Sequence, residues 1–205
     1  METANKKSSN YGSARHIIIK PERDRTDQEK AEMLAFLNTW LTPKEISQHF
    51  DADIDPACPP KMPWRTAKVM FTEKDDGLAQ HWPTDRFVFM NPPYNRKADG
   101  TSLANWMTKL ANQGNGVGLV FANTDCRWFH EQVFNHPNCT GVLWLKGRVK
   151  FQNLKGETLS QRKPSALIAY GSEAIARIKA GLEAGVLRGT LQIIGRAPIR
   201  LRLAA

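Results

Sequence analysis

The residues with the clearest chemical potential in this chain are Asn91-Pro92-Pro93-Tyr94. The Asn91 side-chain oxygen and the Pro92 carbonyl are two acceptors, and consecutive prolines fix φ and remove competing backbone donors. Two acceptors placed on the hydrogens of an exocyclic amine draw it toward a tetrahedral geometry and stabilise the positive charge that develops on it. Tyr94 offers a flat face on which a base can stack, worth about 1–3 kcal/mol. The tetrapeptide therefore suits methyl transfer to the amine of an aromatic base.

The position of the tetrapeptide favours this interpretation. It directly follows Phe87-Val88-Phe89-Met90, an apolar run typical of a buried parallel strand, and it precedes a segment with helical periodicity. In α/β sheets, ligands bind in the crevice beyond the carboxyl ends of the strands. The simpler alternative is a stiff turn, because Pro-Pro is common in loops. The placement between a strand and a helix favours a catalytic loop over that alternative.

Strands that alternate with helices in the middle of the chain predict an α/β sheet, parallel at its centre. Ala52 to Asp55 is expected to form a short strand, and residues 56–66, which hold four prolines, a loop. Helices are expected at residues 102–112 and 126–135. Further strands are expected at Gly116–Ala122, Gly141–Leu145, Arg148–Phe151 and Ser165–Tyr170.

The two ends of the chain carry weaker signals. Residues 1–25 are polar and basic and are expected to form a largely disordered arm, with Ile17-Ile18-Ile19 as a candidate edge strand. Thr26 and Glu29 have the spacing of a capping box for a helix that ends near Trp40. The other expected elements are a short helix begun by Thr42-Pro43, a helix from a Ser172 cap to about Ala184, and a terminal hairpin of Thr190–Ile194 and Ile199–Leu203.

The net charge of +9 is unevenly distributed. Residues 1–140 hold 17 Lys and Arg against 17 Asp and Glu, whereas residues 141–205 hold 12 against 3. A neutral body with a basic last third suits a polyanionic partner such as nucleic acid. Charge alone is equally consistent with a well-solvated surface.

Composition excludes several other classes of protein. No apolar run approaches the roughly 20 residues that cross a bilayer, and Met1 to Tyr11 lacks the apolar core of a signal peptide. The expected location is therefore the cytoplasm. Cys58, Cys126 and Cys139 are odd in number and form no CxxC pair, which argues against a disulfide framework and a zinc site. No metal is expected.

Six short segments carry a resemblance that single residues do not. They are Trp40-Leu41-Thr42-Pro43, Phe50-Asp51-Ala52-Asp53-Ile54-Asp55-Pro56-Ala57, Asp76-Gly77-Leu78 with Trp82, Asn91-Pro92-Pro93-Tyr94, Thr124-Asp125 with Trp128-Phe129, and Gly147-Arg148-Val149-Lys150-Phe151. In this order the chain resembles the phage-type, Dam-like DNA N6-adenine methyltransferase family over most of residues 40–171. The tetrapeptide alone is moderately specific, and the ordered set is strong.

The resemblance implies a Rossmann-like methyltransferase fold, S-adenosylmethionine as cofactor, and site-specific transfer of its methyl group to N6 of adenine in DNA. It also implies a phage or prophage origin. Inside a duplex the amine cannot reach a buried cofactor, so the base would be flipped out. Carried over by position, Asn91, Pro92, Pro93 and Tyr94 would hold the adenine. The residues implied at the cofactor are Trp40, Thr42, Pro43, Asp55, Pro56, Asp76 and Asn91.

The carboxylates among these residues have a physical rationale and a plainer alternative. A carboxylate can accept from the cofactor's adenine amine or ribose hydroxyls, which is the role implied for Asp76. Without the resemblance, Asp55 and Asp76 would be interpreted as turn residues before proline and glycine. Many methyltransferases also have a glycine-rich loop over the cofactor, whereas Asp55-Pro56-Ala57 is followed here by Cys58-Pro59-Pro60. Cys58 is more typical of packing than of a cofactor contact.

The short link from Asp55 to Asn91 leaves little room for helices and predicts a pared-down sheet or an abbreviated cofactor cleft. The expected organisation is a flexible arm at residues 1–25, a methyltransferase domain at residues 26–171, and a basic C-terminal extension at residues 172–205. That extension is expected to be a helix and a hairpin packed on the same domain. The larger aromatic side chains expected in the core or pocket wall are Trp64, Trp82, Trp106 and Trp128.

Several basic residues are candidates for contact with double-stranded DNA. Arg96 and Lys97 follow the tetrapeptide and could hold phosphates beside a flipped base, although loop solvation explains them equally well. Arg148 and Lys150 alternate with apolar neighbours and so share one face of a strand. Contacts to the backbone give salt-dependent affinity without sequence choice. The further candidates, in a polar loop, are Lys155, Arg162 and Lys163.

Two alternatives remain open from the sequence. Asn-Pro-Pro-Tyr also occurs in enzymes that methylate protein glutamine or guanine amines in RNA, but those usually carry the glycine-rich loop and lack the segment Gly147–Phe151. Methylation of the cytosine amine is less consistent, because those enzymes usually begin the tetrapeptide with serine. The second alternative is a DNA-binding relative that lost catalysis, against which the intact tetrapeptide argues.

Overall fold

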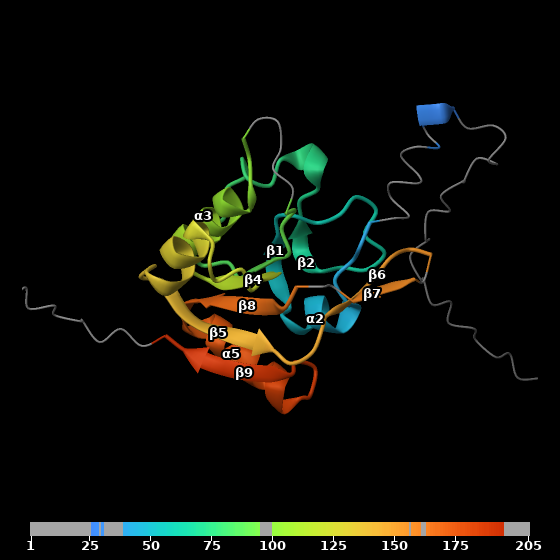
Figure 1. Ribbon diagram of the computed structural model, residues 1–205. Helices are drawn as coiled ribbons and strands as arrows, with labels where there is room; N and C mark the ends of the chain where they lie inside the picture. Colours follow the sequence, from blue (N-terminus) through green and yellow to red (C-terminus); the bar gives the residue numbers. More distant parts are fainter. Residues whose placement is uncertain are drawn as a thin grey trace, which may run out of the picture. The chain divides into compact units, whose positions relative to one another are not determined.

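The computed structural model describes residues 26–28, 30, 39–94, 100–155, 157–160 and 163–194 (Figure 1). The chain divides into one unit of Met1–Ala35 and another of Phe36–Ala205, which contains the sheet. In the first unit, the Lys30 N–H donates to the Thr26 carbonyl over 3.0 Å, as at the start of a helix. The predicted arm, the Glu29 side chain and most of the first predicted helix lie outside the described residues.

A seven-stranded mixed sheet forms the framework of the second unit. Its first four strands are mutually parallel, β8 is antiparallel to both of its neighbours, and β9 is antiparallel to β5. The predicted α/β sheet with a parallel core is confirmed. In spatial order the strands are β2 (Ala67–Met70), β1 (Ala52–Asp55), β3 (Val88–Met90), β4 (Gly116–Phe121), β8 (Ser165–Tyr170), β5 (Cys139–Leu145) and β9 (Gly189–Ile193).

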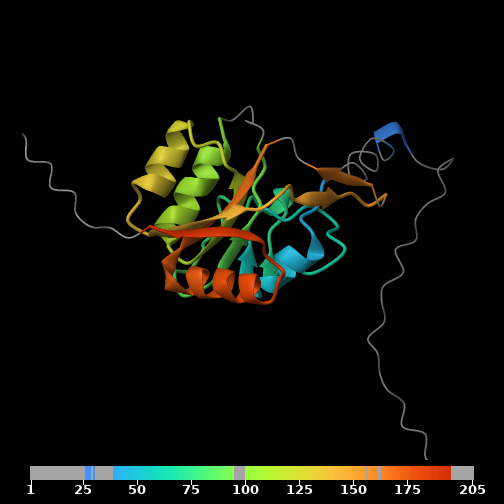
Figure 2. The same ribbon diagram turned by 60° about the horizontal axis from the view of Figure 1, so that its bottom comes forward.

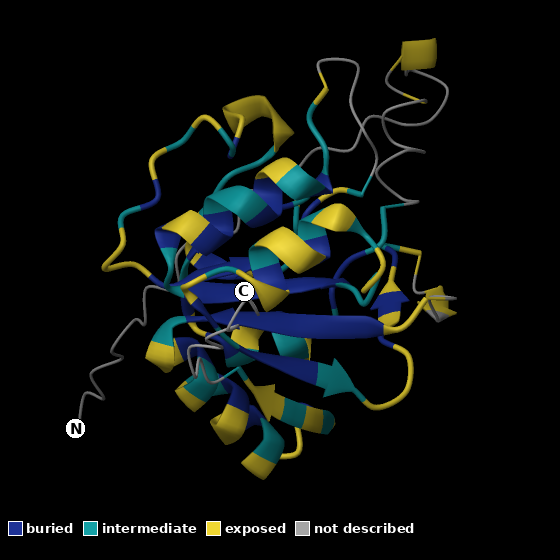
Figure 3. Ribbon diagram, turned by 60° about the vertical axis from the view of Figure 1, so that its left-hand side comes forward, coloured by how far each residue is buried: buried dark blue, intermediate teal, exposed yellow. Residues whose placement is uncertain are grey.

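Helices cover both faces of this sheet, so its central strands are buried on each side (Figure 3). α3 (Leu103–Gln113) and the turn pair α4 (Arg127–Phe129) and η3 (His130–Phe134, a π-helix) pack on one face. α2 (Lys44–His49) and α5 (Gly171–Glu183) belong to the other face. The apolar run Phe87–Met90, which contains β3, is buried on both faces of the sheet. Val88 and Met90 pack in the first core, whereas Phe87 and Phe89 pack in the second.

The helix that follows the tetrapeptide has defined ends. Ser102 caps α3, and its N–H donates to the Asn105 side chain over 2.9 Å in a capping box. Gly114 ends the helix with φ 81°, a conformation that glycine adopts without strain. The apolar face predicted for this helix is buried, with Trp106, Met107 and Leu110 in the core.

A separate two-stranded sheet projects beside the main one (Figure 2). It pairs β6 (Lys150–Gln152) with β7 (Thr158–Ser160). Strand β7 was not predicted, and neither was β2. The predicted strand at Arg148–Phe151 starts later than expected, because only Lys150 onward pairs with β7.

Two local predictions are corrected by the structure. The N-cap of α5 is Tyr170 and not Ser172, because the helix already begins at Gly171. Pro43 is the N-cap residue of α2 and does not lie in its first turn. The strand predicted at Thr190–Ile194 is present as β9 and pairs with β5. Its predicted hairpin partner Ile199–Leu203 lies outside the described residues.

The connection between β1 and β3 is as short as the sequence predicted. It contains β2 and a single 3-10 turn, η2 (Glu73–Asp75), and no α-helix in this fully described stretch. Across the described parts of the chain, no helix has both the length and the apolar character to span a membrane.

Candidate active site

Asn91 stands at the carboxyl end of β3, where its amide has two different environments. Its Nδ2 donates to Oγ1 of Thr42 over 2.9 Å. Its Oδ1 is buried and accepts no hydrogen bond from the described residues. Buried polar atoms are nearly always paired, so an unpaired acceptor at a strand end marks a position for a ligand donor.

The segment that carries Thr42 is also held in place by strand β6. Leu41 and Gln152 of β6 exchange two backbone hydrogen bonds, of 2.7 and 3.2 Å. Thr42 itself is only 5% exposed, and Trp40 is half-buried against the second core. The structure thus joins three of the recognised segments: Trp40–Pro43, the tetrapeptide, and the segment that leads into β6.

Tyr94 lies with its ring stacked on Phe121, the last residue of β4. The ring centroids are 4.2 Å apart and the planes differ by 24°. The Tyr94 hydroxyl donates to the Leu119 carbonyl over a long 3.4 Å. Burial raises the pKa of this hydroxyl, so the residue is a neutral aromatic platform.

A cavity of about 300 Å³ opens beside this aromatic pair. It lies at the carboxyl edge of the parallel strands, between the loop after β3, the start of α3 and the loop after β4. Aromatic walls of this kind suit a flat heterocycle. The lining residues are Tyr94, Ser102, Leu103, Ala104, Phe121, Asn123, Trp128 and Lys163.

Asp55 ends β1 with both carboxylate oxygens occupied. One accepts from the Thr66 hydroxyl at 2.5 Å and the other from the Ala57 N–H at 3.1 Å. The second bond makes an Asx turn over Pro56. The side chain is 4% exposed, and burial raises its pKa from 3.8 to about 6. Burial also raises the pKa of the neighbouring Cys58 thiol to about 12, which keeps it protonated.

The Asp76-Gly77-Leu78 segment packs onto the same strand end. A Cβ at Gly77 would lie 1.8 Å from the Pro56 carbonyl oxygen, so only glycine allows this approach. The Trp82 indole N–H donates to the Gly77 carbonyl over 2.9 Å. Lys109 of α3 donates to the carbonyls of Leu78 and Gln80, each over 2.5 Å. Asp76 is exposed, with φ 48°, beside this anchored turn.

The Lys109 ammonium is partly withdrawn from water in this position. It also lies 4.6 Å from the Trp82 ring centroid. Burial lowers its pKa, and the carboxylate of Asp76 opposes that effect. Trp82 and Trp106 stack beneath it with centroids 6.3 Å apart, so both belong to the core as predicted.

The predicted DNA-contacting residues divide into two groups. Arg148 and Lys150 are exposed, whereas the intervening Val149 and Phe151 are buried, as the alternation predicted. Both lie at the base of the β6–β7 hairpin. Arg96 and Lys97 lie outside the described residues.

Sequence reasoning missed part of the cavity wall. Phe121 was not singled out, although it ends an apolar strand two elements after the tetrapeptide, where a ligand-facing residue is common. Ser102 and Asn123 carried no signal of their own. Trp128 was expected only to be core or pocket wall, and it lines the cavity.

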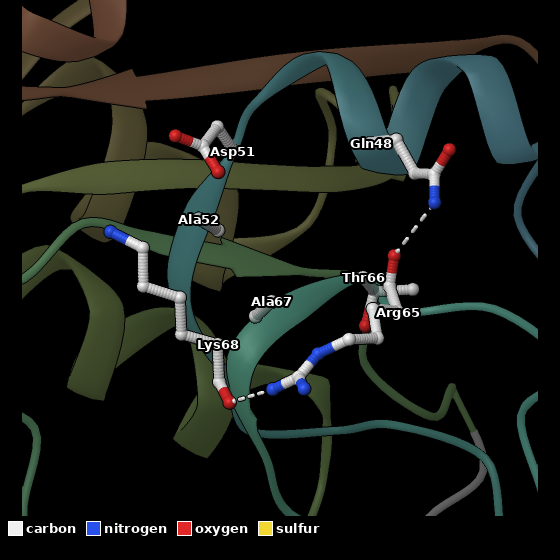
Figure 4. A pocket seen from close by; sticks show the side chains of 7 residues that line it. All are labelled: Gln48, Asp51, Ala52, Arg65, Thr66, Ala67 and Lys68. Atoms are coloured by element: carbon white, nitrogen blue, oxygen red, sulfur yellow. Dashed lines mark hydrogen bonds between the residues drawn. The ribbon is translucent and has the colours of Figure 1, made fainter. Parts of the chain in front are cut away.

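A second cavity, of about 320 Å³, lies at the amino ends of the parallel strands, away from the ends that carry Asn91 (its lining residues are shown in Figure 4). It is formed around Ala52 and Ala67, the first residues of β1 and β2. Arg65 donates to the Lys68 carbonyl there, and Gln48 to the Arg65 carbonyl. Because these are the amino ends of parallel strands, this cavity is remote from the tetrapeptide.

Comparison with known proteins assigns the chain to a family. A search of curated proteins and a search of solved structures gave no match. The family model for DNA N-6-adenine-methyltransferase (Dam) matches residues 35–175, which is more than half of the chain. The predicted Rossmann-like methyltransferase fold, the use of S-adenosylmethionine and the reaction on DNA adenine are confirmed at the level of the family. The chain therefore belongs to the DNA N-6-adenine-methyltransferase (Dam) family.

Proposed function

We propose that Asn91-Pro92-Pro93-Tyr94 is the catalytic loop of this DNA adenine methyltransferase, acting on an adenine flipped out of double-stranded DNA. The observation that carries the proposal is the buried Oδ1 of Asn91 at the carboxyl end of β3, which accepts no hydrogen bond from any residue that the structure describes. An acceptor held at that position suits the hydrogens of an exocyclic amine. The Pro92 carbonyl is the second acceptor, held rigidly by the two prolines.

The flipped base enters the cavity beside Tyr94 and stacks on its ring. Phe121 supports Tyr94 from behind, and Trp128 forms another wall. Removing a base from the duplex costs a few kcal/mol in lost stacking and pairing, which aromatic contacts in the pocket offset.

The residues proposed to surround the cofactor are Trp40, Thr42, Pro43, Asp55, Pro56, Asp76 and Asn91, of which Thr42 has its hydroxyl oxygen already bonded to Asn91 Nδ2. The segments that hold them meet at the carboxyl ends of β1 and β3, and the exposed Asp76 carboxylate is available to accept from hydroxyls. S-adenosylmethionine supplies the electrophilic methyl group when bound. Asp55 contributes mainly through the loop that it shapes, because both of its oxygens already have protein donors.

Arg148 and Lys150 are proposed to contact DNA phosphates from the base of the hairpin, with Arg96 and Lys97 beside the catalytic loop. Lys163 lies at the cavity rim, where a phosphate next to the flipped base would pass. We propose a methyltransferase domain at residues 26–171, on which the described part of the C-terminal extension packs, since α5 and β9 belong to the same sheet assembly. We further propose site-specific action in the cytoplasm.

The test is incubation of purified protein with labelled S-adenosylmethionine and unmethylated double-stranded DNA, followed by nucleoside analysis. N6-methyladenine in double-stranded DNA is the expected product. Label confined to single-stranded DNA, RNA or protein would contradict the proposal. Binding of S-adenosylmethionine without any transfer would indicate an inert DNA-binding relative.

A further inference from the structure

The Asn91 amide can lie with either its oxygen or its nitrogen toward the substrate, and only one of these two orientations suits the proposed reaction. A neutral carboxamide offers an acceptor at one end and two donors at the other. Only the oxygen can accept from the hydrogens of a base amine, so a reversed amide would place donor against donor. In the structure Nδ2 donates to Thr42 Oγ1 over 2.9 Å, and within the described part of the chain no donor bonds Oδ1.

We propose that Thr42 is a positioning residue for methyl transfer, which holds the Asn91 amide so that its oxygen faces the base amine. The inference rests on the proposed function, in which Asn91 Oδ1 is an acceptor for that amine. Thr42 acts through Asn91 and not on the reacting atoms. In the structure the hydroxyl oxygen accepts from Nδ2, which turns Oδ1 to the substrate side. In the reversed orientation the hydroxyl would donate to Oδ1 and the NH2 group would face the base amine, donor against donor, so only the first orientation is productive.

Thr42 is well placed for this role because its own position is fixed. Its neighbour Leu41 is tied to Gln152 of β6 by two backbone hydrogen bonds. The next residue, Pro43, caps α2 with φ −49°. The Thr42 side chain is buried and β-branched, which restricts its rotamers. A hydroxyl held this firmly keeps an acceptor for Nδ2 in a fixed position before substrate arrives.

This role makes a different prediction from a direct contact between Thr42 and the cofactor. A cofactor contact predicts weaker binding of S-adenosylmethionine when the hydroxyl is removed. Positioning of Asn91 predicts a lower kcat with cofactor affinity unchanged, because the interaction matters at the base amine.

The first experiment compares Thr42→Val and Thr42→Ser with wild type. Valine keeps the shape and removes the hydroxyl, so kcat should fall about tenfold, as for loss of one buried hydrogen bond. Serine keeps the oxygen and should recover most of that loss. The Kd for S-adenosylmethionine, measured by calorimetry, should stay within about twofold of wild type for both. Thr140→Val is the matched control, because the Thr140 hydroxyl lies at the amino end of β5 and donates to the Ala169 and Gly171 carbonyls there.

The second experiment repeats Thr42→Val in an Asn91→Asp background. A carboxylate has two oxygens and no donor end, so its orientation does not need to be selected. Thr42→Val should therefore change kcat by less than about threefold in that background. A purely structural role for Thr42 predicts the same loss in both backgrounds.

Three results would overturn the positioning role. They are a wild-type kcat for Thr42→Val, a weakened cofactor Kd with unchanged kcat, and equal losses in the two backgrounds. If Asn91→Asp has no activity, the positioning role is tested by the first experiment alone, that is, by kcat and the cofactor Kd of Thr42→Val and Thr42→Ser against wild type. Full activity of Asn91→Ala would contradict the proposed function itself, which separates that failure from failure of the Thr42 role.

Discussion

The ring of Tyr94 lies against the ring of Phe121, with centroids 4.2 Å apart and planes 24° apart. One residue follows strand β3 and the other ends strand β4, so the stack joins the two central parallel strands at their carboxyl ends. An aromatic ring backed in this way has little freedom to tilt. It therefore presents a fixed surface to a base that enters the adjacent cavity.

Substitution of Tyr94 should separate its ring from its hydroxyl. Tyr94→Phe removes only a long 3.4 Å hydrogen bond to the Leu119 carbonyl, so kcat/KM should fall by less than about threefold. Tyr94→Ala removes the platform and should cost about 10- to 100-fold in kcat/KM for DNA. Steady-state kinetics on a duplex substrate measures both. A Phe variant as impaired as the Ala variant would show that the hydroxyl, and not the ring, matters.

Asn91→Ala should reduce kcat by roughly 100- to 1000-fold, because it removes an acceptor for the base amine. Cofactor affinity, measured by calorimetry, should be largely retained. Asn115→Ala is the matched control, because Asn115 lies at the amino end of β4 and bonds Glu173. Wild-type turnover by the Asn91 variant would remove this residue from the mechanism.

Gly77→Ala should disturb the cofactor side of the site. Its Cβ would meet the Pro56 carbonyl oxygen at 1.8 Å, so the Asp76–Leu78 turn must move away from β1. We expect a loss of about 1–3 kcal/mol in the free energy of unfolding, together with about tenfold weaker binding of S-adenosylmethionine. Gly118→Ala is the control, since its Cβ would meet only side-chain atoms, at 3.2 Å or more. Unchanged cofactor affinity in the Gly77 variant would place the cofactor elsewhere.

Lys150→Ala should weaken DNA binding uniformly across sequences. If Lys150 contacts one phosphate, the slope of log K against log salt concentration should become shallower by about 0.9. Lys179→Ala, on the exposed side of α5, removes the same charge and should leave the slope unchanged. Fluorescence anisotropy over a range of salt concentrations measures the slopes. Identical slopes for wild type and the Lys150 variant would exclude this contact.

Asp55 should make stability depend on pH. Because its folded-state pKa is about 6, above the usual 3.8, the folded protein binds a proton more tightly than the unfolded chain. The burial of this charge therefore costs stability above pH 6, and the cost disappears as pH falls from about 6 to about 4. Two pKa units correspond to roughly 3 kcal/mol.

The matching variant is Asp55→Asn, whose side chain stays neutral throughout this range. Relative to wild type, its free energy of unfolding should rise by up to roughly 3 kcal/mol between pH 4 and pH 7.5. Denaturant unfolding at a series of pH values measures the difference. Parallel curves for the two proteins would show that the Asp55 carboxylate is already ionised at pH 4.

Local sequence determined the central part of this protein. The apolar run before Asn91 fills both faces of the sheet, and the Ser102 cap and Gly114 stop define the helix that follows. Such signals depend on neighbours close in the chain, so strand β3, the tetrapeptide and α3 were predictable together. The ordered segments then pointed to the family that the comparison confirmed.

Tertiary structure decided what local pattern could not. Strands β2 and β7 are short, β2 exposes Lys68 and Val69, and β7 exposes Leu159, so neither presents a buried apolar run. Strand β2 forms because β1, 15 residues earlier in the chain, supplies its hydrogen bonds, and β7 forms because it pairs with β6 in a hairpin. The same holds at the site: Thr42 and Asn91 are 49 residues apart, and Tyr94 and Phe121 belong to different strand ends. The sequence specifies the residue types, but the orientation of the Asn91 amide depends on its hydrogen bond to Thr42, which forms only in the folded protein.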